Sequence, residues 1–251
     1  MLACAVLRRT ENEMAETRQE KPPVALFALA VVTAILLCVA LYLIFAVAPV
    51  ELQMGIVQKI FYFHVPSAYA MYVGFVVCFV GSAGYLWKRT PKWDALSVAG
   101  AEVGLVFCLV VLITGPLWAR KAWGYFWVWD PRLTTTLLAG MVFMAYVVLR
   151  GFGSGSEAEK KFAAGLGIVG VLDLPIIHYS VRKWSGQHPT VITGRGGGLH
   201  PDMYPALWVS FAAFTALVAL LLWARARVEV MRQRVEAIEL EAAERGLLED
   251  A

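Results

Sequence analysis

Charged residues are scarce in this chain, and so are the cysteine patterns that mark redox or covalent cofactor sites. Only 16% of the 251 residues are charged, whereas 59% are hydrophobic. Soluble domains average about a quarter charged. The four cysteines form no C-x-x-C or C-x-x-C-H pattern, and no Walker motif is present. The sequence therefore indicates a membrane protein without a thioredoxin-like motif, a covalent haem-attachment motif or a P-loop nucleotide site.

Six apolar stretches meet or approach the roughly 20 residues that a helix needs to cross a bilayer. They are Val24–Ala48, Val65–Trp87, Ala95–Leu117, Leu133–Leu149, Phe162–Val181 and Tyr204–Ala224. We therefore predict an all-α integral membrane protein. It is expected to be a six-helix bundle that is surrounded by membrane lipid and has no nucleic acid partner. The expected parts are an N-terminal tail (1–23), a membrane domain (24–224) and a C-terminal amphipathic helix (225–251).

The distribution of Lys and Arg predicts the orientation of the bundle. Fifteen of these residues fall in the two tails and in the loops after the second and fourth spans, and seven fall in the other loops. Cytoplasmic segments carry the excess of Lys and Arg. Both termini are therefore expected in the cytoplasm, and the loops after the first, third and fifth spans on the outer face. The tail beyond Ala224 has apolar residues at helical spacing, which suits a surface helix, a partner helix or a solvated tail.

The outer loop at 118–132 is unusually rich in aromatic residues. Six of the twelve residues from Trp118 to Trp129 are aromatic. An interfacial aromatic belt explains one or two such residues per helix end, but not this density. Flat rings stack on flat ligands, so the loop is interpreted as a platform for one. The expected surface consists of Trp123, Trp127 and Trp129, with Trp118 and Tyr125 beside it.

All four histidines lie on or near the expected outer half of the chain. His64 precedes the second span, and His188 follows the fifth span in the last outer loop, close to Trp184. A single histidine is more often a hydrogen-bonded surface residue than a metal ligand. Two histidines that flank an aromatic platform favour haem, because haem iron takes two axial ligands and neutral imidazole is a common one. The roles of His178 and His200 stay open.

Charged residues near the platform have several possible roles. Asp130 is expected to hold the loop by accepting hydrogen bonds from backbone or indole N–H groups. Arg132 is a candidate for binding haem propionates, because its guanidinium is a bidentate carboxylate ligand. Glu102 and Asp173 fall inside expected spans, where acids are costly and usually face the bundle interior. Three roles remain open for these two acids: they could pair with each other, bind a partner subunit or take part in proton movement.

The run Trp123-Gly-x-x-Trp127-x-Trp129-Asp130 resembles the tryptophan-rich motif of the haem-handling proteins of cytochrome c maturation. Within that superfamily the chain is similar to the haem exporter protein C family. The motif continues Pro-Arg132-Leu-Thr, the fifth span contains Asp173-Leu-Pro, and the chain has six expected spans. The resemblance covers about 61–188.

This resemblance implies a function and a set of site residues. It implies non-covalent haem b at the outer face of a bacterial inner membrane, with two outer histidines as axial ligands, which correspond to His64 and His188. It also implies that haem is handed to a periplasmic haem chaperone, beside a small single-span membrane subunit and an ATP-binding cassette complex. No catalytic turnover is expected. The remaining implied haem-binding residues are Trp118, Trp123, Tyr125, Trp127, Trp129, Asp130, Arg132 and Trp184.

The chain departs from the family pattern at two aromatic pairs, where Phe126-Trp127 and Lys183-Trp184 replace adjacent tryptophans. Each exchange keeps one aromatic ring, so weaker or shifted contacts are expected and not loss of the site. Two other functions stay open, a transporter that moves haem across the membrane and a haem-containing electron-transfer subunit. The intramembrane acids would suit a transporter, but no inverted repeat is present in the sequence. A haem-containing electron-transfer subunit usually needs histidine pairs on facing helices.

Overall fold

The computed structural model describes residues 23–153, 155–184, 186–188 and 198–246. These residues are almost entirely helical. The helices are α2 (Val24–Tyr42) with a π-helical turn η1 (Leu43–Val47), the 3₁₀ turn η2 (Ile56–Ile60), α3 (Phe61–Lys88), α4 (Pro91–Trp123), α5 (Pro131–Phe152), α6 (Glu157–Val171), α7 (Asp173–Trp184), the 3₁₀ turn η3 (Pro201–Met203) and α8 (Tyr204–Glu244). The predicted helical class is confirmed.

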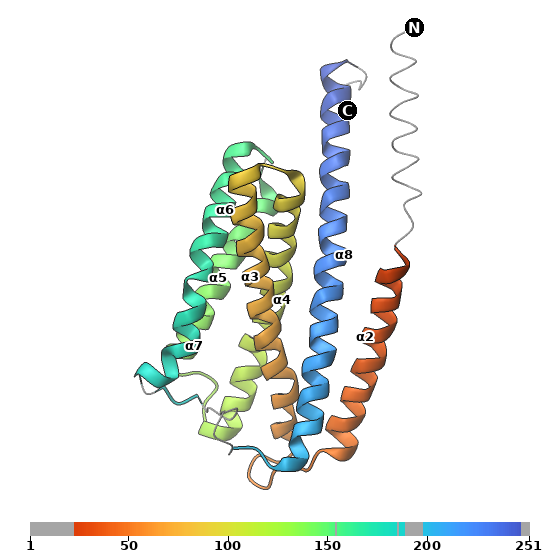
Figure 1. The fold of residues 1–251 in the computed structure, drawn as a ribbon. Helices are drawn as coiled ribbons and strands as arrows, with labels where there is room; N and C mark the ends of the chain where they lie inside the picture. Colours follow the sequence, from red (N-terminus) through yellow and green to blue (C-terminus); the bar gives the residue numbers. More distant parts are fainter. Residues whose placement is uncertain (1–22, 154, 185, 189–197, 247–251) are drawn as a thin grey trace.

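Among the described residues, six helical segments are long and apolar enough to cross a membrane, which confirms the expected number of spans. They are Val24–Val47, Ile56–Lys88, Pro91–Trp123, Pro131–Phe152, Glu157–Ser180 and Pro201–Glu244. The start of α2 and the end of α8 lie at the same end of the bundle (Figure 1). The end of α4 and the start of α5 lie at the other end, which we call the tryptophan-rich end.

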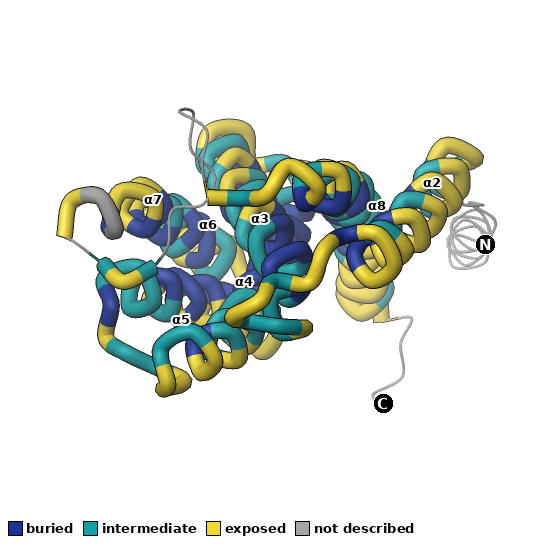
Figure 2. Tube along the Cα trace, turned by 90° about the horizontal axis from the view of Figure 1, so that it is seen from below, coloured by how far each residue is buried: buried dark blue, intermediate teal, exposed yellow. Residues whose placement is uncertain are grey.

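The backbones of α3 and α4 touch because glycines face each other at their crossing. A Cβ on Gly74 would lie 2.5 Å from the backbone of Gly104, and one on Gly100 would lie 2.3 Å from the nitrogen of Cys78. Small residues allow this approach in membrane helices, where packing replaces the hydrophobic effect as the driving force. The main core lies around this pair, with Phe75 stacked on Phe143 of α5 at a centroid distance of 3.6 Å. Helix α2 stands apart beside α8 and is largely exposed (Figure 2).

Several helix bounds differ from the sequence expectation. Helix α3 begins at Phe61, so His64 lies inside the helix and not in the loop before it. Pro66 is the sixth residue of this helix and has no N–H, so the carbonyl of Tyr62 lacks the hydrogen bond that another residue there would donate. Helix α4 continues to Trp123, so the loop expected at 118–132 is helical in its first part. The fifth span is broken at Leu172 and resumes as α7.

Lys59 connects the end of the first span to the start of the second. Its side chain is buried, and its ammonium group donates hydrogen bonds to the carbonyl oxygens of Ile44 and Ala48. These carbonyls belong to the π-helical turn and the residue after it, where the helix leaves acceptors unsatisfied. A cation also interacts favourably with a helix C-terminus. This bond holds the turn η2, and with it the first residues of α3.

Ion pairs join the helices at the end opposite the tryptophan-rich end. The two acids expected at membrane depth, Glu102 and Asp173, do not pair with each other. Glu102 of α4 instead accepts a hydrogen bond of 2.6 Å from Arg225 of α8. Arg225 and Arg232 also pair with Glu229, whose side chain is fully buried. Helix α8 continues without interruption past Ala224, so that Arg225 projects back against α4. Asp173 is buried at the start of α7.

A second buried cluster gives a test of this end of the bundle. Arg150 of α5 lies 2.7 Å from Asp94 and 3.3 Å from Glu159, and the three side chains are at most 8% exposed. We expect Arg150→Met to lower the free energy of unfolding by about 3–5 kcal/mol, because it leaves two buried carboxylates without their cation. Heat or denaturant unfolding in detergent measures this.

Lys161→Met is the matched control for that experiment. Lys161 pairs with Glu157 at 3.7 Å, but both side chains are about half exposed or more. An exposed pair contributes at most about 1 kcal/mol. Equal effects of the two substitutions would show that the Arg150 cluster does not stabilise the bundle.

Candidate functional site

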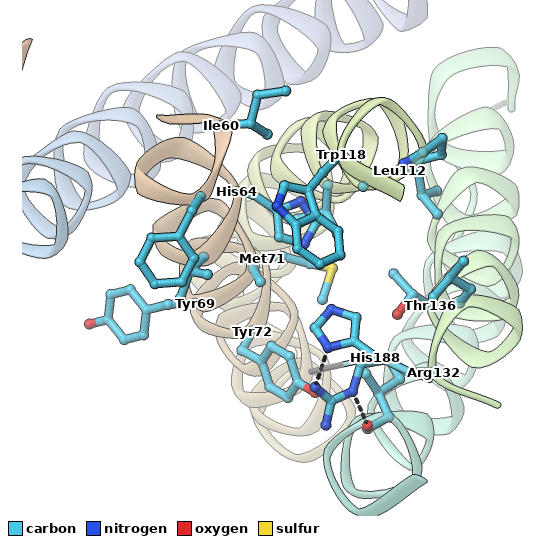
Figure 3. A pocket seen from close by; sticks show the side chains of 18 of the residues that line it. Ile60, His64, Tyr69, Met71, Tyr72, Leu112, Trp118, Arg132, Thr136 and His188 are labelled. Carbon is cyan, nitrogen blue, oxygen red and sulfur yellow. Dashed lines mark hydrogen bonds between the residues drawn. The ribbon is translucent and has the colours of Figure 1, made fainter. Parts of the chain in front are cut away.

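A cavity of about 560 Å³ opens at the tryptophan-rich end of the bundle. Its wall comes from η2, α3, α4, α5, α7 and α8 together with Trp127 and His188 from the connecting segments. Most of the lining is aliphatic or aromatic, with few polar groups. Sites for small molecules have volumes of roughly 300–1,000 Å³ and this kind of lining. Figure 3 shows His64, Trp118, Arg132 and His188 around the same space.

Six of the ten predicted site residues line this cavity, and they come from distant parts of the chain. The six are His64, Trp118, Trp123, Trp127, Arg132 and His188. The other four, Tyr125, Trp129, Asp130 and Trp184, do not line it. Trp129, one of the three rings expected to form the platform surface, is 73% exposed. It packs edge-on against Trp127 at a centroid distance of 5.7 Å, and Trp127 takes the cavity side.

His64 projects from the first turn of α3 toward α4. Its Nδ1 lies 2.8 Å from the hydroxyl oxygen of Thr114. Gly115 lets the imidazole approach α4, because a Cβ there would lie 3.3 Å from the ring carbon Cε1. The ring is therefore held by a hydrogen bond with one turn of a neighbouring helix, on which the glycine leaves room for it.

His188 is held by the tryptophan-rich segment through the residue before it. Asp130 caps the start of α5 by accepting a hydrogen bond from the N–H of Arg132 at 2.8 Å. Its second oxygen accepts one from the N–H of Gln187 at 2.5 Å. The hydroxyl of Tyr125 donates to the Gln187 side chain at 2.6 Å. Asp130 thus accepts from backbone N–H groups, as the sequence suggested, and Tyr125 and Asp130 support the site from outside the cavity.

Arg132 contacts His188 directly. Its Nη1 donates to Nδ1 of His188 at 3.2 Å (Figure 3). Its other nitrogens donate to the carbonyl oxygens of Ile177 and His178 in the middle of α7. A guanidinium group has five N–H donors in one plane, so it can join several acceptors at once. Arg132 therefore ties α5, α7 and His188 together at the cavity wall.

The imidazoles of His64 and His188 face each other across the cavity. Their ring centroids are 6.4 Å apart, and the ring planes are inclined by 29°. Trp118 and Trp123 pack edge to face beside them at a centroid distance of 5.6 Å. The indole N–H of Trp127 is buried and has no hydrogen-bond acceptor among the described residues. The cavity thus offers two neighbouring imidazole rings, aromatic walls and one donor for a polar group.

Sequence reasoning missed several residues of this site. Thr114, Tyr72 and Thr136 lie in apolar helices and attract no attention by composition. Thr114 precedes Trp118 by four residues, so the helical repeat places both on one face of α4. That spacing was the signal available for it. His178, whose role the sequence left open, also lines the cavity, whereas His200 is exposed and lies near Asp202.

Comparisons with known proteins agree with the resemblance seen in the sequence. The family model described as "Heme exporter protein C" matches residues 13–241. A protein of that name from Bradyrhizobium diazoefficiens is 37% identical over 220 residues, which cover 86% of this chain and 83% of the relative. The protein of that name from Escherichia coli K12 is 33% identical, covering 79% and 81%. A "Putative cytochrome c biosynthesis ccmC-like mitochondrial protein" from Arabidopsis thaliana is 32% identical, covering 83% and 80%.

The double role of Asp130 predicts local loosening when its carboxylate is removed. In Asp130→Ala the N–H of Gln187 loses its acceptor and α5 loses its cap. Each loss costs about 1–2 kcal/mol. We expect amide hydrogen exchange of the segment around Gln187 to become roughly 5–30-fold faster, since exchange follows the free energy of local opening.

Asp202→Ala is the control for Asp130→Ala. Asp202 lies in another connecting segment, and its side chain is 73% exposed. Its loss should leave exchange near Gln187 unchanged. Equal exchange in the parent protein and in Asp130→Ala would contradict the proposed support of His188.

Proposed function

Because the chain belongs to the haem exporter protein C family, we propose that it binds haem b non-covalently in this cavity and presents it to a periplasmic haem chaperone during cytochrome c maturation. The observation that carries the proposal is the pair of imidazoles from His64 and His188, which face each other across an aromatic cavity. The chain acts as a carrier in this proposal, without catalytic turnover.

The spacing of the two imidazoles suits a single iron between them. A bond between a metal and an imidazole nitrogen is roughly 2 Å long, so two rings that hold one metal from opposite sides have centroids roughly 6 Å apart. The separation of 6.4 Å is close to this value. No group of three or more His, Cys, Asp or Glu residues able to hold a metal ion occurs among the described residues. Two histidines suffice for iron that arrives with four porphyrin nitrogens already bound.

The rest of the cavity suits the porphyrin and its propionates. Trp118, Trp123 and Trp127 supply flat apolar area, and aromatic rings bind flat ligands through it. The buried indole N–H of Trp127 has no acceptor among the described residues, and a propionate oxygen would provide one. Arg132 supplies positive charge at the wall, although its guanidinium is also engaged with α7 and His188. Bound haem would contribute its iron as the centre that the two histidines hold.

The position of the cavity favours presentation over electron transfer within the membrane. Both histidines lie at the tryptophan-rich end, next to connecting segments, and not at the middle of facing helices. The tryptophan-rich end is the outer face if the Lys and Arg distribution is followed. There the cavity would be accessible to a chaperone in the periplasm. In this proposal the protein resides in a bacterial inner membrane, beside a small single-span subunit and an ATP-binding cassette complex that releases the loaded chaperone.

Haem transport through the bundle is the second candidate. The break between α6 and α7, with Asp173 buried beside it, is the feature that favours transport. Broken helices line substrate sites near the middle of the membrane in many transporters. The carbonyl of Leu174, beside the break, accepts a hydrogen bond from Tyr72 at 3.4 Å, and Tyr72 lines the cavity. The two candidates differ in whether haem stays between the histidines or passes on toward this break.

An absorption spectrum of the detergent-purified protein tests the proposal. We expect a Soret band of low-spin haem in the parent and a shifted or weakened band in His64→Ala and in His188→Ala, because each variant loses one axial ligand. His200→Ala is the control, since this histidine is exposed and does not line the cavity. Unchanged haem binding in both single variants would reject the bis-histidine site and direct attention to His178 and to the bundle interior.

A further inference from the structure

An iron-binding histidine must offer an unprotonated ring nitrogen, and the partner of its other nitrogen decides which one that is. For His64 this partner is Thr114, which lies on a different helix and does not line the cavity. We propose that Thr114 is a positioning residue that keeps the proton of His64 on Nδ1, so that Nε2 is ready to bind the haem iron. This inference rests on the proposed function, because it assumes that His64 is a haem ligand.

The hydrogen bonds of Thr114 determine the direction of its contact with His64. A threonine hydroxyl has one proton to donate and two lone pairs to accept with. The hydroxyl lies 2.6 Å from the carbonyl oxygen of Val110, to which it donates. A carbonyl oxygen has no proton, so the donor in that bond is Thr114. The oxygen of Thr114 therefore accepts in its contact with His64, and Nδ1 of His64 carries the proton.

The packing of α3 against α4 makes this arrangement rigid. Thr114 and Gly115 belong to one turn of α4, and His64 lies near the start of α3. The absence of a Cβ at Gly115 leaves room for the ring against α4, since a Cβ there would lie 3.3 Å from Cε1. Ligands held by elements that are themselves rigid keep their geometry better than ligands on loops. His64 is thus oriented before haem arrives.

His188 has the opposite arrangement in this structure. Its Nδ1 accepts a hydrogen bond from Nη1 of Arg132, and a guanidinium can only donate. The proton of a neutral His188 therefore lies on Nε2. Ligation through Nε2 requires a change in its contact with Arg132, whereas His64 requires none. The two histidines are inequivalent, and His64 is the ligand that is prepared in advance.

Substitution of Thr114 in the full-length, detergent-purified protein tests the proposal. Thr114→Val keeps the shape and removes the acceptor, and Thr114→Ser keeps the hydroxyl. Loss of an outer-shell partner of a metal ligand typically weakens metal binding by about 10–100-fold. We expect Thr114→Val to bind haem about 10–100-fold more weakly. The reduction potential of the bound haem should also rise, because a less basic imidazole stabilises ferric iron less. Thr114→Ser should restore both values.

Thr33→Val is the matched control. Thr33 of α2 is buried and donates to the carbonyl of Leu29, four residues earlier, at 2.7 Å, just as Thr114 donates to Val110. It has no part in the cavity. The control separates loss of a helix back-bond from loss of the contact with His64. Its haem affinity and reduction potential should equal those of the parent.

Nitrogen NMR of histidine-labelled, haem-free parent protein gives a second measurement that needs no substitution at Thr114. We expect the proton of His64 on Nδ1, with His64→Ala used to assign the signal. A proton on Nε2 would overturn the proposal. Parent-like affinity and potential in Thr114→Val would also overturn it, while loss of haem in His64→Ala would leave the proposed function intact. Unchanged haem binding in His64→Ala would reject both.

Discussion

Glycines at the crossing of α3 and α4 let the two backbones touch, and this contact fixes the distance between His64 and Thr114. A side chain at Gly74 or Gly104 would push the two helices apart. The separation would break a hydrogen bond of 2.8 Å that has little tolerance for movement. In a membrane, where apolar packing and not hydrophobicity drives helix association, such small residues carry much of the specificity. The geometry of one proposed haem ligand thus depends on residues remote from the cavity.

Much of the fold could be predicted from the sequence, because six apolar runs of membrane length admit few alternatives. The ends of the helices could not. An apolar run ends where polar residues begin, but α4 continues through Arg120 and Lys121 to Trp123, since cationic side chains are favourable at a helix C-terminus. The C-terminal helix expected at 225–251 is continuous with the last span as far as Glu244, and the ion pair of its Arg225 with the bundle could not be predicted either. Its partner Glu102 lies more than 100 residues away, and no local pattern shows that pair.

The sequence predicted the members of the candidate site whose residue type indicates their role. It did not predict those whose role depends on a contact in the folded protein. The two histidines and the tryptophans were identifiable because imidazole and indole groups are rare and gather near one end of the chain's helices. Which rings face the cavity depends on packing between Trp127 and Trp129, which alternate between inside and outside. Thr114 was not identifiable by type, because a threonine in a membrane helix usually satisfies itself on the backbone. It does so here, and that bond is what makes its oxygen an acceptor for His64.

The two ends of the bundle are held by different interactions, and the difference is consistent with the proposed release of haem. Buried ion pairs join α4, α5 and α6 at the end opposite the site, where breaking one is costly. A partly exposed pair between Arg225 and Glu102 joins α8 to α4. At the tryptophan-rich end, His188 is held by a short segment through Asp130, Tyr125 and Arg132. Each of those bonds contributes about 1–3 kcal/mol, so the segment can change its contacts without unfolding the bundle. His64 is fixed on rigid helices and His188 on this short segment. In the proposed function, exchange of the His188 ligand would therefore be the step that lets haem leave.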